Sequence, residues 1–223
     1  MPDGLPQGFP GQLLKNAAVI PVPVDDTELQ ASVSRRPIKS AQSIEIVWNH
    51  RWEHDKQPEV FFNAMAKLID HGIDVKLHIM GQSFREVPDC FSDFKSRYNN
   101  NVQTWGYQSR EEYWQILQRS HLVVSAALHD FQGLGMLEAI MAGCTPVAPG
   151  RMAYPEYIPE SLLYKVPCSD EADSLFNKLL SVIERGDVAS SESSIDIEEY
   201  RLNNVMPLYK ACFSKLVALR TGA

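Results

Sequence analysis

Short apolar runs alternate with longer amphipathic stretches between residues 43 and 185. The runs are rich in valine, isoleucine and leucine and are bounded by glycine, proline or polar residues, which is typical of buried strands. They predict strands over residues 44–48, 75–81, 102–106, 121–126, 145–149 and 162–166. The amphipathic stretches predict helices over residues 58–71, 88–97, 110–119, 134–143 and 170–185.

Start and stop signals support these helices. Pro58 suits the first turn of a helix, where its missing amide proton costs nothing, and Gly72 suits the position after the end. Ser109 and Glu112 have the spacing of a capping box. A last helix is expected over residues 197–220, interrupted or started at Pro207.

Strand and helix follow one another with short connections, and this order indicates an α/β fold. We expect a Rossmann-like parallel sheet with helices on both faces. Ligands of such sheets bind outside the carboxyl ends of the strands. The candidate site residues are therefore those that directly follow each strand.

Residues 1–40 differ from the rest of the chain. They hold six of the fourteen prolines. The run VIPVPV at 19–24 is consistent with one extended strand or an edge segment, and the remainder with a linker or the remnant of a preceding domain. We place a boundary near Ala41, which leaves residues 41–223 as one domain that ends in helices.

Composition narrows the class of protein. With 223 residues, 44% of them hydrophobic, the chain can bury one sizeable core. Its net charge of -7 indicates that the chain does not bind nucleic acid by itself. No apolar run has the length of a membrane span, and the first residues lack the apolar core of a signal peptide. The four cysteines stand apart without metal spacing, which favours a reducing, cytoplasmic setting.

Two acids bound the stretch DFQGLGMLE, residues 130–138. Asp130 is expected in the loop after the fourth strand, and Glu138 two turns into the helix that follows. Between them, free backbone N–H groups and the positive end of the helix dipole suit a phosphate. Because the acids suit sugar hydroxyls, the stretch favours a sugar-nucleotide pocket. The alternative is that Glu138 simply faces solvent on the polar side of its helix.

Two cations follow the first predicted strand. Arg51 can bind a diphosphate through its planar guanidinium, and Lys56 can do so as a point charge. The alternative is a solvated charged loop that binds no ligand. Gly81 ends the second strand, where it either allows a ligand close to the backbone or simply forms a turn.

Aromatic residues and histidines add two further candidates. Trp105–Gly106–Tyr107, after the third strand, offers a stacking surface to a base or else packs in the core. His129, beside Asp130, is the histidine best placed to contact a ligand. His50 and His54 lie in a loop with no third ligand, so no metal site is expected. Neither GxGxxG nor GxSxG occurs, which argues against a dinucleotide site and a serine nucleophile.

Taken in order, these features resemble a known superfamily. R-x4-K after the first strand, glycine after the second, W-G-Y after the third, and D-x7-E into A-G-C-T-P-V are similar to the nucleotide-sugar half of retaining GT-B glycosyltransferases, over residues 43–165. Longer motifs resemble the tRNA-queuosine alpha-mannosyltransferases, which move mannose from GDP-mannose onto queuosine in tRNA. These motifs are W-x-H-R-W-E-H-D-K-x-P-E, G-Q-S-F-x-x-V-P-D, W-G-Y and Y-P-E-x-x-P.

The resemblance implies a role for each matched position. Arg51 and Lys56 would hold the donor diphosphate, and Glu138 the ribose hydroxyls. Asp130, which stands where the family has a glutamate, would contact the transferred sugar at longer range or through water. Gln132 stands where relatives often have a second aromatic. The remaining implied contacts are backbone groups of Phe131, Gln132, Gly133, Leu134 and Gly135 for sugar or phosphate, and Trp105, Gly106 and Tyr107 for the base.

The resemblance also implies a mechanism and a missing partner domain. Transfer would retain the anomeric configuration without an obligatory metal or cofactor, and the cations and helix dipole would stabilise the leaving diphosphate. In GT-B enzymes an acceptor half precedes the donor half, whereas only about 40 residues precede it here. We therefore expect one half of a GT-B fold that is inactive alone, with the tRNA-binding surface in the other half.

Two other functions fit the same residues. One is transfer of another sugar to a glycan, lipid or small molecule, which a panel of GDP-, UDP- and ADP-sugars would separate. The other is a non-catalytic nucleotide-binding module on the same fold. If the chain is such a module, we expect no binding of GDP, and we expect that Arg51→Ala and Lys56→Ala change nothing measurable.

Overall fold

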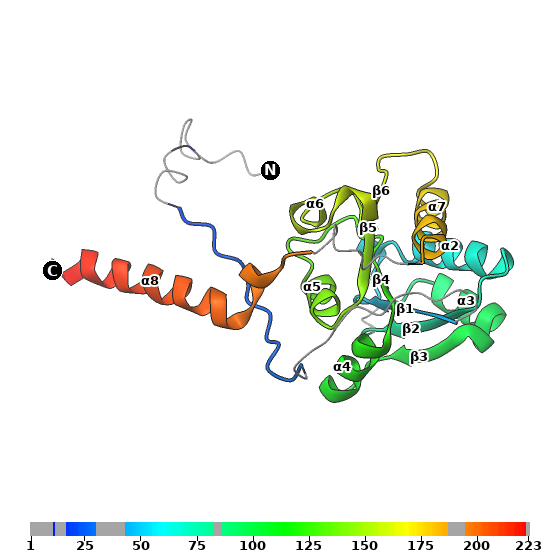
Figure 1. The fold of residues 1–223 in the computed structure, drawn as a ribbon, viewed down its shortest axis with the longest axis horizontal. Coiled ribbons are helices and arrows are strands. Elements are labelled where there is room, and N and C mark those ends of the chain that lie inside the picture. The colour runs from blue at the N-terminus through cyan, green and yellow to red at the C-terminus, as the bar shows by residue number, and fades with distance from the viewer. Residues whose placement is uncertain (1–10, 12–16, 30–42, 83–85, 187–194, 222–223) are drawn as a thin grey trace.

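The computed structural model describes residues 11, 17–29, 43–82, 86–186 and 195–221. Six strands form one sheet in which every neighbouring pair is parallel. The predicted α/β class is therefore confirmed (Figure 1). The strands are β1 (Ile44–Asn49), β2 (Val75–Met80), β3 (Val102–Gly106), β4 (Leu122–Val124), β5 (Thr145–Pro149) and β6 (Leu163–Tyr164).

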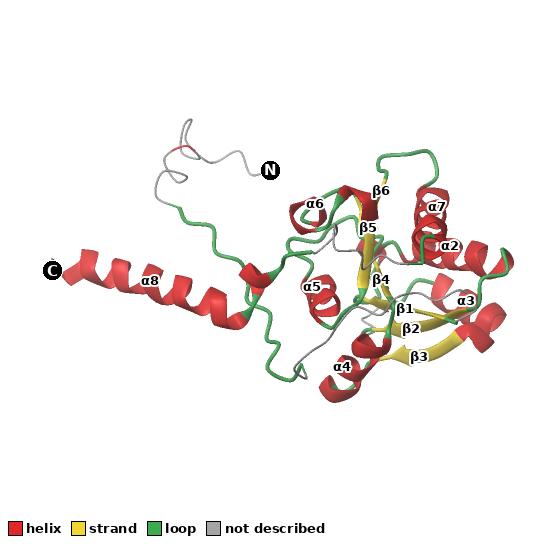
Figure 2. Cartoon of the chain, viewed as in Figure 1, coloured by secondary structure: helices red, strands yellow, loops and turns green. Residues whose placement is uncertain are grey.

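Helices cover the sheet on both sides, as Figures 1 and 2 show. On one side lie α2, α3 and α7, and α2 contacts both of the others. On the other side lie α4, α5 and α6. The helices are α2 (Pro58–Asp70), α3 (Cys90–Tyr98), α4 (Arg110–Arg119), α5 (Leu134–Met141), α6 (Tyr154–Tyr157), α7 (Glu171–Glu184) and α8 (Leu202–Thr221).

The core forms because both faces of the central strands are covered. Ile46, Val47 and Trp48 follow one another in β1 and are all fully buried, which is the pattern of a strand between two helical layers. Trp48 packs against Phe61 of α2 and Phe91 of α3. The inner face of α2 thus joins the aromatic part of the core to the sheet.

The strand order is β3-β2-β1-β4-β5-β6. The chain builds outward from β1 to β3 and then returns to the other side of β1 with β4. The connections that follow β1 and β4 therefore leave toward opposite faces, which opens a crevice between the carboxyl ends of these two strands. This is the place in the fold where a ligand site is expected.

The local signals read from the sequence act as anticipated in most helices. Ser109 accepts a hydrogen bond from the amide of Glu112, whose side chain accepts from the amide of Ser109, so the capping box at the start of α4 is complete. Pro58 is the first residue of α2. The short helix α6 was not predicted, because four residues are too few to show a helical period.

Of two predictions about the ends of the chain, the one about Pro207 is wrong, and the strand predicted at 19–24 is present only as a single bridge. Helix α8 begins at Leu202 and continues through Pro207, so no start or interruption occurs at the proline. A proline there removes one amide donor, which leaves the carbonyl of Asn203 without its helical partner but does not stop the helix. The predicted strand at 19–24 makes a single bridge, from Val24 to Arg201. The expected boundary at Ala41 lies outside the described residues.

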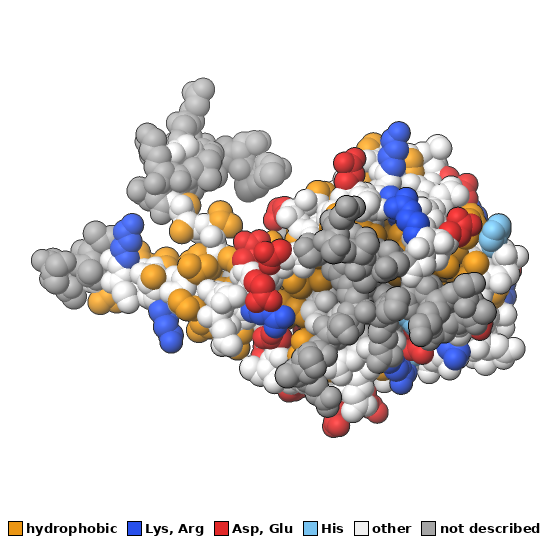
Figure 3. Space-filling view, in the orientation of Figure 1, with side chains coloured by type: hydrophobic (Ala, Val, Ile, Leu, Met, Phe, Trp, Pro, Cys, Tyr) orange, Lys and Arg blue, Asp and Glu red, His pale blue; other side chains and the backbone are white. Residues whose placement is uncertain are grey.

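Helix α8 projects away from the sheet in Figure 1, and apolar side chains run along it in Figure 3. Leu208, Phe213 and Leu216 are each about half exposed or more. Within the described ranges, no helix combines the length and hydropathy that a membrane crossing requires.

Candidate functional site

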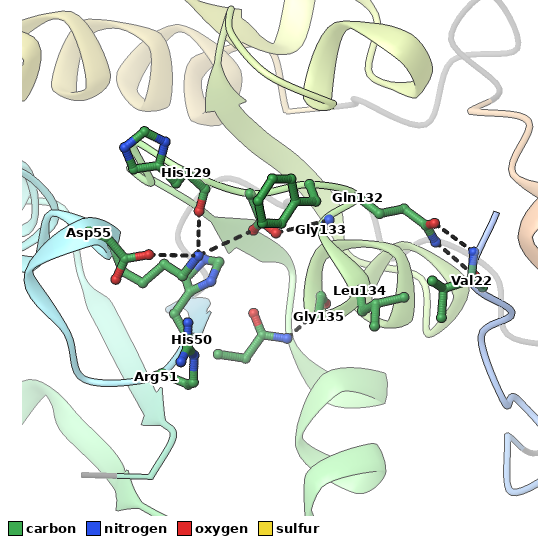
Figure 4. A pocket seen from close by; sticks show the side chains of 13 residues that line it. Val22, His50, Arg51, Asp55, His129, Gln132, Gly133, Leu134 and Gly135 are labelled. Carbon is green, nitrogen blue, oxygen red and sulfur yellow. Dashed lines mark hydrogen bonds and ion pairs between the residues drawn. The ribbon is translucent and has the colours of Figure 1, made fainter. Parts of the chain in front are cut away.

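Two cavities lie at the carboxyl ends of the central strands and share Asn49, His50 and Arg51. The first, of about 560 Å³, lies between the loops that follow β1 and β4 (Figure 4). The second, of about 420 Å³, lies beside the loops that follow β2 and β3. The first is also lined by Val22, Asp55, Lys56, His129, Asp130, Phe131, Gln132, Gly133, Leu134 and Gly135. The second is also lined by Met80, Gly81, Gln82, Tyr107, Gln108, Arg110 and Tyr113.

Lys56 brings a buried positive charge to the first cavity. A short 3₁₀ turn after β1, His54–Lys56, directs it inward, and the residue is only 7% exposed. Its Nζ donates to the carbonyl of His129 at 2.5 Å and lies 3.3 Å from Asp55 Oδ2 and 4.0 Å from Asp130 Oδ2 (Figure 4). An ammonium held in this way is ordered before any anionic ligand arrives.

Asp130 shapes the loop between β4 and α5. Its Oδ1 accepts a hydrogen bond from the amide of Gly133 at 3.0 Å, and its Oδ2 accepts one from the hydroxyl of Tyr154 at 2.9 Å. Gly133 has a φ of 74°, and a Cβ there would lie 2.5 Å from the hydroxyl of Tyr157. The carboxylate that was predicted to contact sugar thus fixes the turn into α5.

Arg51 and His50 form the wall between the cavities. The side chain of Arg51 is 55% exposed, and its Nη1 lies 3.2 Å from Glu53 Oε2. His50 is buried, and desolvation lowers the pKa of its imidazole to about 4. The nearby Lys56 ammonium also lowers this pKa, whereas Asp130 and Asp55 oppose the change. The ring is therefore neutral at neutral pH.

Glu138 projects from α5 into a hydrogen-bond chain. Its Oε2 accepts from the hydroxyl of Tyr113 at 2.6 Å, and that hydroxyl accepts from Asn49 Nδ2 at 2.8 Å. Burial raises the pKa of Glu138, and the bond from Tyr113 opposes the rise. Glu138 is thus half-buried and not simply solvated, but it lines neither cavity, and its hydrogen bond goes to Tyr113, which lines the second. No sequence motif marks Tyr113.

The three residues after β3 separate in the structure. Trp105 lines neither cavity, and its ring packs against Trp52 and Phe91, with centroids 5.0 and 5.9 Å away. This is the core-packing alternative considered for it. Tyr107 is 76% exposed and lines the second cavity. The carbonyl of Gly106 accepts from the amide of Gly81, which ties the two strand ends together.

The rim of the first cavity includes a segment far away in sequence. Gln132 accepts a hydrogen bond from the amide of Val22 and donates one to its carbonyl, each at 2.8 Å (Figure 4). The side chain of Gln132 therefore holds the chain that precedes the domain against the loop before α5. Phe131 beside it is 96% exposed. Sequence patterns do not reveal this contact, because it joins residues 110 positions apart.

The candidate site is thus a two-part groove with cations at its centre. Of the residues named from the sequence, Arg51, Lys56, His129, Asp130 and the loop Phe131–Gly135 surround the first cavity. Gly81 and Tyr107 line the second. In the part of the chain that the structure describes, no three His, Cys, Asp or Glu side chains are grouped to hold a metal ion. The groove suits an elongated ligand with an anionic middle.

Known proteins include relatives of this chain. The family described as "Glycosyl transferases group 1" matches residues 33–192. A tRNA-queuosine alpha-mannosyltransferase of Drosophila melanogaster is 31% identical over 180 residues, which are 78% of this chain and 46% of that protein. The chain thus spans about half the length of this curated relative.

Solved structures share the fold. A sucrose-phosphate synthase from Thermosynechococcus elongatus is similar with a TM-score of 0.71 and 18% identity, over 96% of this chain and 57% of that one. A glycosyltransferase from Rickettsia africae is similar with a TM-score of 0.63 and 16% identity, over 80% of this chain and 49% of that one. At these identities the similarity concerns the fold alone.

Proposed function

This chain belongs to the group 1 glycosyl transferases, and we propose that its joined cavities bind GDP-mannose as the donor for transfer of mannose to queuosine in tRNA. The observation that carries the proposal is the meeting of two cavities at Arg51, with the buried ammonium of Lys56 on the wall of the first. The mannosyltransferase relative supports the choice of sugar and acceptor. The motifs shared with that family support GDP as the carrier.

A nucleotide sugar fits the groove in one direction. Tyr107 offers an exposed ring on which a base can stack, so the base belongs in the second cavity. The diphosphate then lies near Arg51 and Lys56, and the sugar lies in the first cavity below the loop that Asp130 fixes. The start of α5 adds backbone N–H groups and a positive dipole end beside the phosphates.

Catalysis in this proposal is electrostatic. The bond between the anomeric carbon and the distal phosphate oxygen breaks, and negative charge grows on the leaving GDP. Arg51 and Lys56 stabilise that charge more in the transition state than in the ground state, which accelerates the reaction. The acceptor hydroxyl bonds to the same face of the sugar, and its proton passes to the leaving phosphate oxygen. The anomeric configuration is thereby retained.

The acceptor is bound outside this chain in the proposal. A net charge of -7 does not favour a surface for the phosphates of tRNA. The relative is about twice as long as the matched region, which leaves room for a second domain facing the groove. We therefore assign donor binding to this chain and tRNA binding to the rest of the whole protein, in the cytoplasm.

A transfer assay with the full-length protein tests the proposed function. It compares labelled GDP-mannose with UDP- and ADP-sugars, each offered with queuosine-containing tRNA and with the same tRNA lacking queuosine. We expect label in tRNA only from GDP-mannose and only when queuosine is present. Transfer from a UDP- or ADP-sugar instead would favour the alternative of a different donor. Label that appears equally in both tRNAs would contradict queuosine as the acceptor.

A further inference from the structure

The guanidinium of Arg151 joins the loops that follow β1, β4 and β5. Arg151 lies in the loop after β5 and lines neither cavity. Its Nε donates to the carbonyl of Ala127 at 3.0 Å, and its Nη2 donates to the carbonyl of Ala126 at 3.1 Å, both beyond the end of β4. Nη2 also donates to Oε1 of Gln57, which caps the start of α2, at 2.9 Å. One planar cation thus holds the loop after β1 against the loop after β4.

Glu171, at the start of α7, holds this guanidinium in its orientation. Its two carboxylate oxygens each lie 2.8 Å from a different terminal nitrogen of Arg151, which makes the ion pair bidentate. The two side chains are only 20% and 19% exposed. Ala126 and Ala127 are fully buried, so their carbonyl oxygens need a donor from the protein. The guanidinium is therefore fixed by the carboxylate on one side and by the two loops on the other.

Gln57 connects this contact to the candidate site. Its φ is 46°, a left-handed conformation that side chains other than glycine rarely adopt, so the contacts around it must hold it there. Lys56 directly precedes it in the chain. Two further contacts join the same loops, because the amide of Leu128 donates to the carbonyl of Asp55 at 2.8 Å and Lys56 Nζ donates to the carbonyl of His129. The buried ammonium and the guanidinium thus bridge the same two loops.

We propose that Arg151, oriented by Glu171, is a positioning residue that sets where the Lys56 ammonium lies on the wall of the first cavity. This rests on the proposed function in one respect, that the anion which Lys56 meets is a diphosphate. Without the guanidinium, two buried carbonyls and the side chain of Gln57 lose their donor, and the two loops separate more easily. The ammonium then loses the fixed place from which it stabilises a bound anion.

Reaction of the lysines with acetic anhydride, followed by mass spectrometry, tests the positioning without any ligand. Lys56 should react slowly in the unmodified chain, because it is buried and hydrogen-bonded. In Arg151→Lys, which keeps a cation but loses the planar fork, we expect Lys56 to react about three- to tenfold faster, the effect of losing one hydrogen bond. The exposed Lys76 on β2 should react equally in both proteins. Glu171→Gln should change Lys56 in the same direction and decides the matter if Arg151→Lys does not fold. An unchanged rate at Lys56 overturns the proposal.

Calorimetry with GDP then separates positioning from a general loss of structure. Arg151→Lys should weaken GDP binding about three- to tenfold where Lys56 is present, and less than about twofold in the Lys56→Gln background, because Arg151 acts through Lys56. Equal weakening in both backgrounds is the result for a residue that only supports the fold, and it overturns the proposal. Arg119→Lys is the matched control and should bind GDP like the unmodified chain, since Arg119 pairs with Glu45 and lines neither cavity. If the unmodified chain binds no GDP, the proposed function fails, and the acetylation rate of Lys56 alone decides whether Arg151 positions it.

Discussion

The imidazole of His50 is buried beside charged groups at the wall of both cavities. Burial lowers its pKa from 6.5 to about 4, and Lys56 acts in the same direction. Its Nε2 makes no hydrogen bond to the described residues. A neutral ring costs less in this place than an imidazolium, because burial removes the water that would solvate the charge.

The lowered pKa predicts a pH dependence of stability that belongs to His50. Between pH 6.5 and about 4 the unfolded chain binds a proton at this ring and the folded chain does not, so the free energy of unfolding falls as the pH falls through this window. In His50→Gln, the decrease in the free energy of unfolding between pH 7 and pH 5 should be about 1–2 kcal/mol smaller than in the unmodified chain. Urea unfolding of both proteins at the two pH values measures it. An identical loss in the variant would show that His50 is not the group responsible.

At the residue scale, the sequence indicates side chains whose own charge suits an anionic ligand. Arg51 and Lys56 were predicted from their place after a strand, and both line the first cavity. The sequence did not identify Tyr113 or Tyr154 as partners of site residues, and it did not reveal the contact of the predicted site residue Gln132 with Val22. Each contacts a residue that is distant in sequence, so its effect depends on tertiary packing that no local pattern encodes.

At the scale of elements, periodicity and caps predicted most of the sheet and its helices, because burial on both faces leaves a strong apolar signal in each strand. The failures have local causes. Helix α6 is too short to show a period. Pro207 lies inside α8, because a helix can lose one hydrogen bond where the rest of its turns continue.

The end of β2 packs against the loop after β1 with no room for a side chain. A Cβ on Gly81 would lie 2.0 Å from the carbonyl oxygen of His50. Gly81 was predicted to let a ligand approach or to form a turn; in the structure it lets two segments of backbone approach each other, and it also lines the second cavity. Gly72, at the end of α2, also has a positive φ, but a Cβ on it would meet nothing within 4 Å.

This difference predicts unequal costs for two similar substitutions. Gly72→Ala should destabilise by about 1 kcal/mol, the cost of a left-handed alanine. Gly81→Ala should cost roughly 2 kcal/mol more and should weaken GDP binding, because it displaces the backbone of His50 and Arg51. Urea unfolding and calorimetry measure the two effects. Equal destabilisation by both variants would contradict the packing described for β2.

At the scale of the whole molecule, strand alternation indicated a doubly wound sheet but not the order of its strands. That order depends on which edges meet when the chain folds, and it places the reversal between β1 and β4. The groove that results is formed by described residues of this chain alone. The proposed donor binding can therefore be measured on this chain.

Calorimetric titration of GDP into the chain, compared with Arg51→Ala, tests the central claim that the groove binds a nucleotide diphosphate. Arg51 is the suitable cation to remove, because its side chain is 55% exposed and the fold does not depend on burying it. Lys67→Ala is the matched control, since Lys67 pairs with Asp170 and Asp173 at the start of α7 and lines neither cavity. We expect GDP to bind the unmodified chain and Lys67→Ala alike and to bind Arg51→Ala about ten- to a hundredfold more weakly. No binding to the unmodified chain, or equal binding to Arg51→Ala, would contradict the account.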